Sequence, residues 1–179
     1  MTWKEAFLRQ AQHDYGVYLE CNASQKPISQ QLHYLQMATE KLAKALSCRR
    51  KNDPPRTTHA AMGKFLRIAK TRPDLRRNLG YGGNYRAFVS YVDSLLPFAE
   101  KIEALAPEGG KLDKPNTEYP WLSPSGEVVV PLDHTFNDIR LDVVNMNKLK
   151  TLIANLFRIS RLESAGRNLA THSDGTRAV

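Results

Sequence analysis

The sequence has little cysteine and little histidine. Its 179 residues contain only two cysteines, Cys21 and Cys48, and a chain of this length buries enough apolar surface to fold without a disulfide. The five histidines are scattered, without the paired Cys or His spacing of structural zinc sites. We therefore expect no disulfide, no bound metal and no other cofactor.

Long hydrophobic runs are also missing. The longest ones, at residues 128–130 and 152–154, are far shorter than the roughly 20 apolar residues of a membrane-spanning helix. The N-terminus carries charges in its first turns and has no apolar stretch of the signal-peptide type. The sequence predicts a cytoplasmic protein with no membrane partner.

The common phosphate-loop motifs are absent as well. The glycine cluster at residues 80–83 lacks the preceding strand and the spacing of a Walker or Rossmann motif. No carboxylate pair, activated nucleophile or metal-ligand constellation stands out, so the sequence does not favour a conventional small-molecule enzyme.

What the sequence has is helical periodicity. Hydrophobic residues make up 41% and charged residues 25%, which is typical of one folded domain. Apolar positions at helical spacing predict long helices at residues 3–19, 27–51, 85–105 and 136–161, with a bend or break at Pro97. Thr57 or Thr58 is expected to cap a shorter helix before Pro73, and a helical turn is expected at 74–79. This pattern favours an all-α, antiparallel four- to five-helix bundle.

One segment departs from the helical pattern. Residues 119–122 and 127–130 have the composition of two short strands joined by a four-residue turn, which predicts a small β-hairpin insertion near residues 119–131. The bundle is expected to span residues 1–163. The polar residues 164–179 are expected to form a flexible tail.

The helix predicted from Pro27 carries a motif. Its sequence resembles the second helix of the HEPN superfamily, in which a Gln-x-Ala-x-Glu-Lys-x-x-Lys-Ala run is typical. The matching residues are Gln36, Ala38, Glu40, Lys41, Lys44 and Ala45. An alternative interpretation of the three charged residues is a solvated helix face, on which Glu40 and Lys44 pair at i,i+4.

The resemblance implies a four- or five-helix up-and-down bundle. It also implies an activity, since active members are metal-independent endoribonucleases with an Arg followed four to six residues later by His. Arg167 and His172 match this signature, with Asn168 directly after the Arg. In such a pair, His transfers a proton and Arg stabilises charge on the phosphate. His13, His33 and His59 are interpreted as hydrogen-bonded or partly exposed residues.

Positive charge is concentrated in about one fifth of the chain. Residues 49–86 contain eleven Lys and Arg against two Asp, a net charge of +9, whereas the rest of the chain is near neutral at −1. Phosphate contact is a natural use of such a surface, and neighbouring tyrosines stack on unpaired bases. The candidate nucleic-acid-binding residues are Arg49, Arg50, Lys51, Lys64, Arg67, Arg76, Arg77, Tyr81 and Tyr85.

These observations leave two hypotheses for function. The first is a HEPN-like RNA-binding domain, with or without ribonuclease activity of a toxin or defence type. The second is a non-catalytic interaction module, acting as antidote, sensor or scaffold, whose basic surface binds an acidic partner protein.

The last predicted helix bears on assembly. Active members of the resembled superfamily form their RNA cleft between two protomers, which implies a homodimer. The helix also has apolar residues off its main stripe, which favours a second contact; they are Leu141, Val144, Leu152, Leu156 and Ile159. The alternative is that the hairpin around Trp121 or the N-terminal helix covers these residues within one chain.

Overall fold

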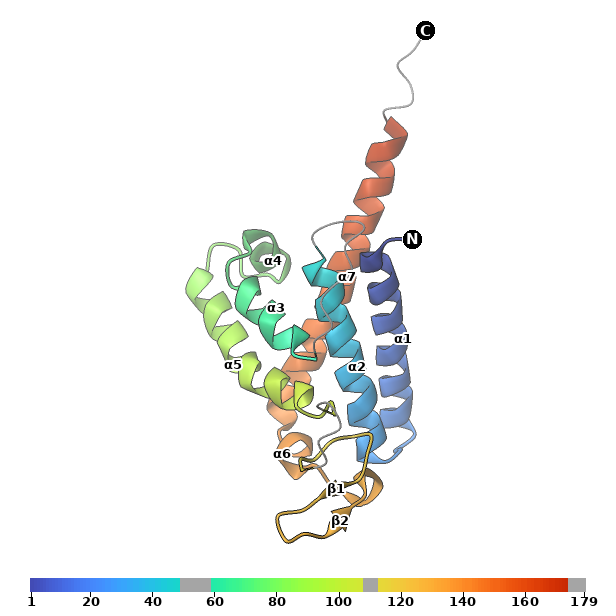
Figure 1. Cartoon of the computed structure of the whole chain (residues 1–179). Coiled ribbons are helices and arrows are strands. Elements are labelled where there is room, and N and C mark those ends of the chain that lie inside the picture. Colours follow the sequence, from blue (N-terminus) through green and yellow to red (C-terminus); the bar gives the residue numbers. More distant parts are fainter. Residues whose placement is uncertain (49–58, 108–112, 174–179) are drawn as a thin grey trace.

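The computed structural model describes residues 1–48, 59–107 and 113–173, with side chains to residue 162. The α-helices are α1 (Trp3–Ala23), α2 (Ile28–Ser47), α3 (Ala61–Ala69), α4 (Pro73–Asn78), α5 (Tyr85–Glu103), α6 (Asn137–Arg140) and α7 (Val143–Ser173). Strands β1 (Trp121–Leu122) and β2 (Val128–Val129) and the 3-10 helix η1 (Pro131–Asp133) lie between α5 and α6. Figure 1 shows the long helices packed lengthwise, with the hairpin at one end. The prediction of an all-α bundle with a small hairpin is confirmed.

Helix α1 starts with the capping box that the three-residue spacing of Thr2 and Glu5 predicts. The Glu5 amide donates to Thr2 Oγ1 at 3.2 Å, and the Thr2 amide donates to the Glu5 carboxylate at 2.7 Å. These bonds satisfy two amides that a helix start otherwise leaves without partners. The helix continues four residues past the predicted end at Leu19, and α2 then runs antiparallel to it (Figure 1).

Helix α2 is the central element of the bundle. Among its residues only Gln30 and Ser47 are exposed, because α1 lies on one side of it and α3 and α5 lie on the other (Figure 1). Gln36 and Glu40 are therefore buried, at 1% and 7% exposure. The interpretation of Glu40 as part of a solvated face is wrong, because a helix covered on two sides has little free surface.

The hairpin has the predicted form. Its strands pair antiparallel, with Trp121 opposite Val129, and Gly126 adopts φ +82° in the turn, a left-handed conformation that glycine tolerates best. The Trp121 ring is buried and lies 5.1 Å from the His134 ring and 6.2 Å from the Phe136 ring. These contacts attach the hairpin to the bundle.

The last helix, predicted at residues 136–161, differs from the prediction in two ways. It is divided into α6 and α7, and Asp142 accepts the amide of Asn145 at 3.3 Å at the start of α7. Helix α7 continues past Arg161, where the sequence pattern predicted its end, to Ser173, and it extends beyond the N-terminal end of α1 (Figure 1). The polar composition of 164–173 suggested a tail, but the segment has no proline and several good helix formers. The flexibility expected of 164–179 remains a prediction.

Much of the apolar surface of α7 is used within the chain. The dimer prediction depended on five apolar residues. Of these, Leu152, Leu156 and Ile159 are buried, whereas Leu141 and Val144 are 65% and 66% exposed. Helix α7 packs on α1, where the Phe157 and Tyr15 rings lie 5.8 Å apart. Three of the five residues that favoured a dimer are thus covered by the bundle itself.

Candidate nucleic-acid interface

A tight turn joins α4 to α5. Gly80 and Gly82 have φ of +86° and +46°, conformations that side-chain-bearing residues rarely adopt. The Asn84 side chain then accepts the amide of Ala87 at 3.0 Å and caps α5, as predicted. This turn brings the basic last turn of α4 next to the first turn of α5. We call Arg76, Arg77, Tyr85 and Arg86 the α4–α5 corner.

The centre of the α4–α5 corner is a stacked pair. The Arg76 guanidinium lies 5.7 Å from the centroid of the Tyr85 ring, and Tyr85 is 50% exposed. Among the described residues, the buried Nε of Arg76 has no hydrogen-bond partner. An arginine held over a ring in this way is positioned before any ligand arrives.

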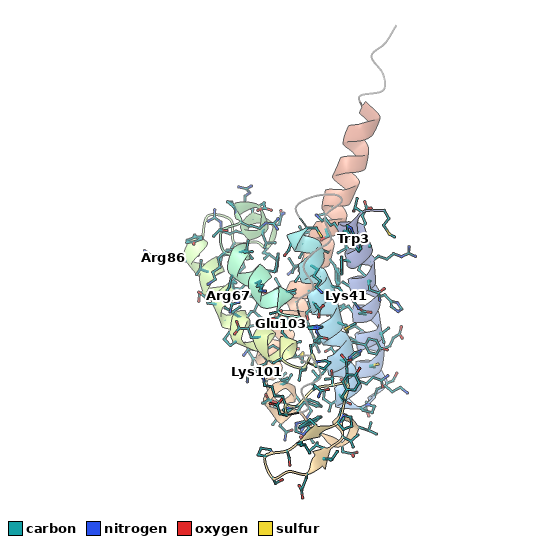
Figure 2. The ribbon with its side chains drawn as sticks, viewed as in Figure 1. Trp3, Lys41, Arg67, Arg86, Lys101 and Glu103 are labelled. Atoms are coloured by element: carbon teal, nitrogen blue, oxygen red, sulfur yellow. The ribbon has the colours of Figure 1, made fainter. Side chains whose placement is uncertain are left out.

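Arg77 and Arg86 flank this pair. Both are exposed, and neither makes an ion pair with another described residue. Figure 2 shows Arg86 at the outer edge of α5, on the side of the bundle away from α1. Three arginines and one exposed ring therefore gather at one end of the bundle.

Tyr81 has a different position from the one expected. Its ring packs 5.6 Å from Phe88 and 5.4 Å from Tyr91, which places it against the core. Burial raises the pKa of the Tyr81 phenol, and burial together with the neighbouring Tyr81 raises the pKa of Tyr91 to about 12. The Tyr81 ring is therefore part of the packing against the core, and Tyr85 is the ring that is exposed to solvent.

Two cations of the predicted basic segment, on α3 and directly after it, form ion pairs with acidic residues. Arg67 forms an ion pair with Glu100, and Lys70 forms one with Asp93. These partners lie on α5, 33 and 23 residues further along the chain. Arg67 and Lys70 thus belong to a mixed-charge surface between α3 and α5.

The other cations of the basic segment are not part of the α4–α5 corner. Lys64 is exposed on α3, while Arg49, Arg50 and Lys51 lie outside the described residues. Arg72 pairs with Asp74 at 2.6 Å, and the hydrogen bond from Arg72 lowers the pKa of that carboxyl. The structure therefore brings together Arg76, Arg77 and Tyr85 of the predicted set, and it adds Arg86, which the charge count alone did not distinguish.

A second polar cluster lies between α2 and the start of α3. Glu40 accepts hydrogen bonds from Gln36 at 3.0 Å and from Lys44 at 2.5 Å, and His59 Nδ1 lies 2.9 Å from the same carboxylate. Burial by itself would raise the pKa of Glu40, but the bonds from Lys44 and His59 outweigh it and lower the pKa. Gln36, Glu40 and Lys44 follow one another at intervals of four residues and therefore share one face of α2. This spacing is the feature of the sequence that could have indicated the cluster.

The start of α3 is set by a distant carboxylate. The amides of Met62 and Gly63 donate to Glu103 Oε1, the latter at 3.1 Å, and Thr57 and Thr58, the predicted caps, lie outside the described residues. Burial, reinforced by Glu100 and Glu40, raises the pKa of Glu103 in spite of these bonds. Figure 2 shows Glu103 toward the middle of the bundle, unlike Arg86 at its edge. We interpret this cluster as structural.

The predicted catalytic pair lies on the C-terminal part of α7. Arg167 and His172 belong to the same helix, but their side chains are outside the described part. Five residues correspond to about 140° around a helix of 3.6 residues per turn. The two positions therefore lie on different faces of one continuous helix, and their catalytic role remains a prediction.

No protein-family model, curated protein or solved structure matches the chain. Within residues 1–48, 59–107 and 113–173, no group of three or more His, Cys, Asp or Glu is arranged to hold a metal ion. None of the helices in these ranges has the length and hydropathy needed to cross a membrane.

Proposed function

We propose that this protein is a HEPN-like helical domain that binds single-stranded RNA through the α4–α5 corner. The observation that carries the proposal is the Arg76 guanidinium, 5.7 Å from the centroid of the exposed Tyr85 ring, with the exposed Arg77 and Arg86 next to the pair in sequence. Unpaired bases stack on aromatic rings and on arginine planes, and arginine donors bind the phosphates between them. The net charge of +8 favours approach of a polyanion.

A single strand fits this corner better than a duplex. The bases of a duplex are stacked on one another and offer no free face to Tyr85, whereas a single strand does. One exposed ring with three arginines suits one or two nucleotides and their phosphates. Binding is therefore expected to be strongly salt-dependent and weakly selective for sequence at this site.

Substitution of Tyr85 tests the proposal. Binding of a fluorescently labelled, guanine-free single-stranded RNA is measured by anisotropy for wild type, Tyr85→Leu and Tyr85→Phe. Loss of a stacking ring costs about 1–3 kcal/mol of binding free energy, so Tyr85→Leu should bind roughly tenfold or more weakly, and Tyr85→Phe should bind like wild type. Trp3→Leu removes another exposed ring, at the start of α1, and serves as the control. Equal affinity for all four proteins would remove Tyr85 from the site.

The enzymatic part of the proposal is a metal-independent endoribonuclease of toxin or defence type, with Arg167 and His172 as its catalytic residues. Cleavage of a labelled RNA by wild type in the presence of a chelator, lost in His172→Ala, would support it. Absence of cleavage by wild type would leave an RNA-binding module without this activity.

An acidic partner protein is the alternative occupant of the α4–α5 corner. Carboxylates also pair with Arg77 and Arg86, but they make no use of the Tyr85 ring. A polyglutamate peptide should therefore bind wild type and Tyr85→Leu equally, whereas RNA should distinguish the two. The Tyr85 variants thus separate the two hypotheses.

A further inference from the structure

A second candidate site lies at the opposite end of the bundle. Between the first turns of α2 and residues 117–119 there is a hollow of about 340 Å³, lined by Ser29, His33, Tyr34, Thr117, Glu118 and Tyr119, with Gln30 at its edge. It lies near the hairpin, whereas the α4–α5 corner lies at the other end of the bundle (Figure 1). The sequence analysis assigned no function to these residues.

Two residues in the lining of this hollow have a buried polar atom without a hydrogen-bond partner among the described residues. Thr117 is 9% exposed, and its hydroxyl has no hydrogen-bond partner among the described residues. The Nδ1 atom of His33 also has no hydrogen-bond partner there, although it lies within ion-pair distance of Glu118 Oε1, at 3.5 Å. Buried polar groups without partners are rare in folded proteins. Two of them in the lining of one hollow indicate a site built to bind a polar ligand.

The loop that carries these groups is held in place. The side-chain oxygen of Asn116, which is 3% exposed, accepts the amides of Glu118 at 2.9 Å and Tyr119 at 2.7 Å. The Thr117 amide donates to the Leu105 carbonyl at 3.3 Å. The backbone that carries Thr117 and Glu118 is thus fixed by the fold, which reduces the ordering cost of binding.

The lining determines the chemistry of the ligand. It contains one carboxylate and no Lys or Arg, although the protein as a whole carries a net charge of +8. Glu118 only accepts hydrogen bonds, and Thr117 both donates and accepts. The rings of Tyr34 and Tyr119 line the hollow, which suits a flat ligand. The ligand should therefore be planar, with adjacent N–H donors and a carbonyl oxygen nearby.

We infer that this hollow binds a guanine base. Guanine is the one common nucleobase with two adjacent N–H donors, N1–H and the 2-amino group, and these match the two oxygens of the Glu118 carboxylate. Its O6 lies beside them and accepts the hydroxyl of Thr117. Adenine and cytosine present an acceptor next to their amino group, and uracil has a single ring N–H on that edge. The volume is at the lower end of the range for small-ligand sites, sufficient for a nucleoside.

The inference stands apart from RNA binding at the α4–α5 corner. A guanine base reaches the hollow either as a free nucleotide or as one residue of a single strand, and the recognising chemistry is the same. Uncharged guanosine has no phosphate for the arginines of the corner. Its binding therefore tests the hollow alone.

The first experiment is an NMR titration of isotope-labelled protein with guanosine and with inosine, which differs from guanosine by the absence of the 2-amino group. Guanosine should shift the amide signals of residues 29–34 and 116–119. Inosine, adenosine, cytidine and uridine should bind about tenfold or more weakly, because a hydrogen bond to a charged group is lost. Absence of guanosine binding at millimolar concentration, or equal binding of guanosine and inosine, would overturn the inference.

Variants then test the two named groups. Glu118→Gln should weaken guanosine binding about tenfold or more, because an amide offers one acceptor in place of two. Thr117→Val removes the hydroxyl with little change in shape and should also weaken binding. Glu127→Gln, in the hairpin turn, is the matched control and should bind like wild type. Equal binding by Glu118→Gln and wild type would contradict the assignment of the carboxylate.

The source of the base is distinguished in an Arg76→Ala/Arg77→Ala background, which removes two arginines of the corner. Tighter binding of an oligonucleotide with one guanine than of GMP would indicate a base within a strand. The reverse order would indicate a free nucleotide. If replacing guanosine by inosine in both ligands left their binding unchanged, the guanine assignment would be wrong.

Discussion

Glu40 offers a sharp test of the buried cluster on α2. Its side chain is only 9% exposed and bonds to Gln36, Lys44 and His59. Glu40→Gln keeps the shape but removes the charge, which leaves the largely buried Lys44 ammonium without its counter-ion. Removing one partner of a buried ion pair costs about 3–5 kcal/mol. We expect about 3 kcal/mol here, at the lower end, because Lys44 retains some exposure.

The pH dependence of the stability difference between wild type and Glu40→Gln provides a second test. The pKa of Glu40 is lower in the folded protein than its ordinary value of 4.5. The stability that this charge provides is therefore present above pH 4.5 and is lost as the pH falls through the folded-state pKa. The difference between wild type and Glu40→Gln should be largest at pH 7 and should shrink as wild-type Glu40 becomes protonated.

Urea unfolding at a series of pH values measures both quantities, with Glu20→Gln, an exposed residue of α1, as the control. The control should stay within about 0.5 kcal/mol of wild type throughout. A Glu40→Gln difference below about 0.5 kcal/mol at pH 7 would refute the reasoning, since surface substitutions are of that size. A difference independent of pH would assign the effect to packing and not to charge.

Two further predictions follow from the helices. Leu35→Ala and Leu42→Ala should each lower the free energy of unfolding by about 2–5 kcal/mol, because both side chains are completely buried on α2. Gln36 lies off the apolar stripe of α2 in the sequence, a position for which little effect of Gln36→Ala is expected. Its burial and its bond to Glu40 now predict a loss of about 1–3 kcal/mol, and chemical denaturation showing no loss would contradict that revision. For assembly, the homodimer expected from the sequence now depends on exposed Leu141 and Val144. Sedimentation equilibrium should give twice the 20.2 kDa chain mass, reduced to one chain by Val144→Asp, and a wild-type mass of one chain would exclude the dimer at that concentration.

The sequence was informative where local patterns decide the structure. The capping box of Thr2 and Glu5, the cap at Asn84 and the strands around Gly126 each depend on residues within a few positions of one another. Hydrophobic periodicity located α2 and α5 for the same reason. Pro97, where a bend or break was expected, lies inside a continuous α5, because the packing of this helix outweighs one lost backbone bond.

Such local patterns do not predict contacts between residues that are far apart in the sequence. Nothing near Arg67 in the sequence indicates that Glu100 pairs with it, and nothing near Met62 indicates that Glu103 caps its helix. The same limit applies to the hollow, where His33 and Thr117 meet although they lie 84 positions apart. The charge count located the basic segment, but only the fold separates its paired cations from those of the α4–α5 corner.

The salt dependence of RNA binding tests the central proposal most directly. The logarithm of affinity for a guanine-free single-stranded RNA is plotted against the logarithm of salt concentration for wild type and for Arg76→Ala/Arg77→Ala. Each phosphate contact of a single strand contributes about 0.7 to the slope. The double variant should therefore bind more weakly, with a slope smaller by about 1.4. Lys26→Ala/Arg140→Ala removes the same charge from exposed sites elsewhere and should keep the wild-type slope. An unchanged slope and affinity in Arg76→Ala/Arg77→Ala would contradict RNA binding at the α4–α5 corner.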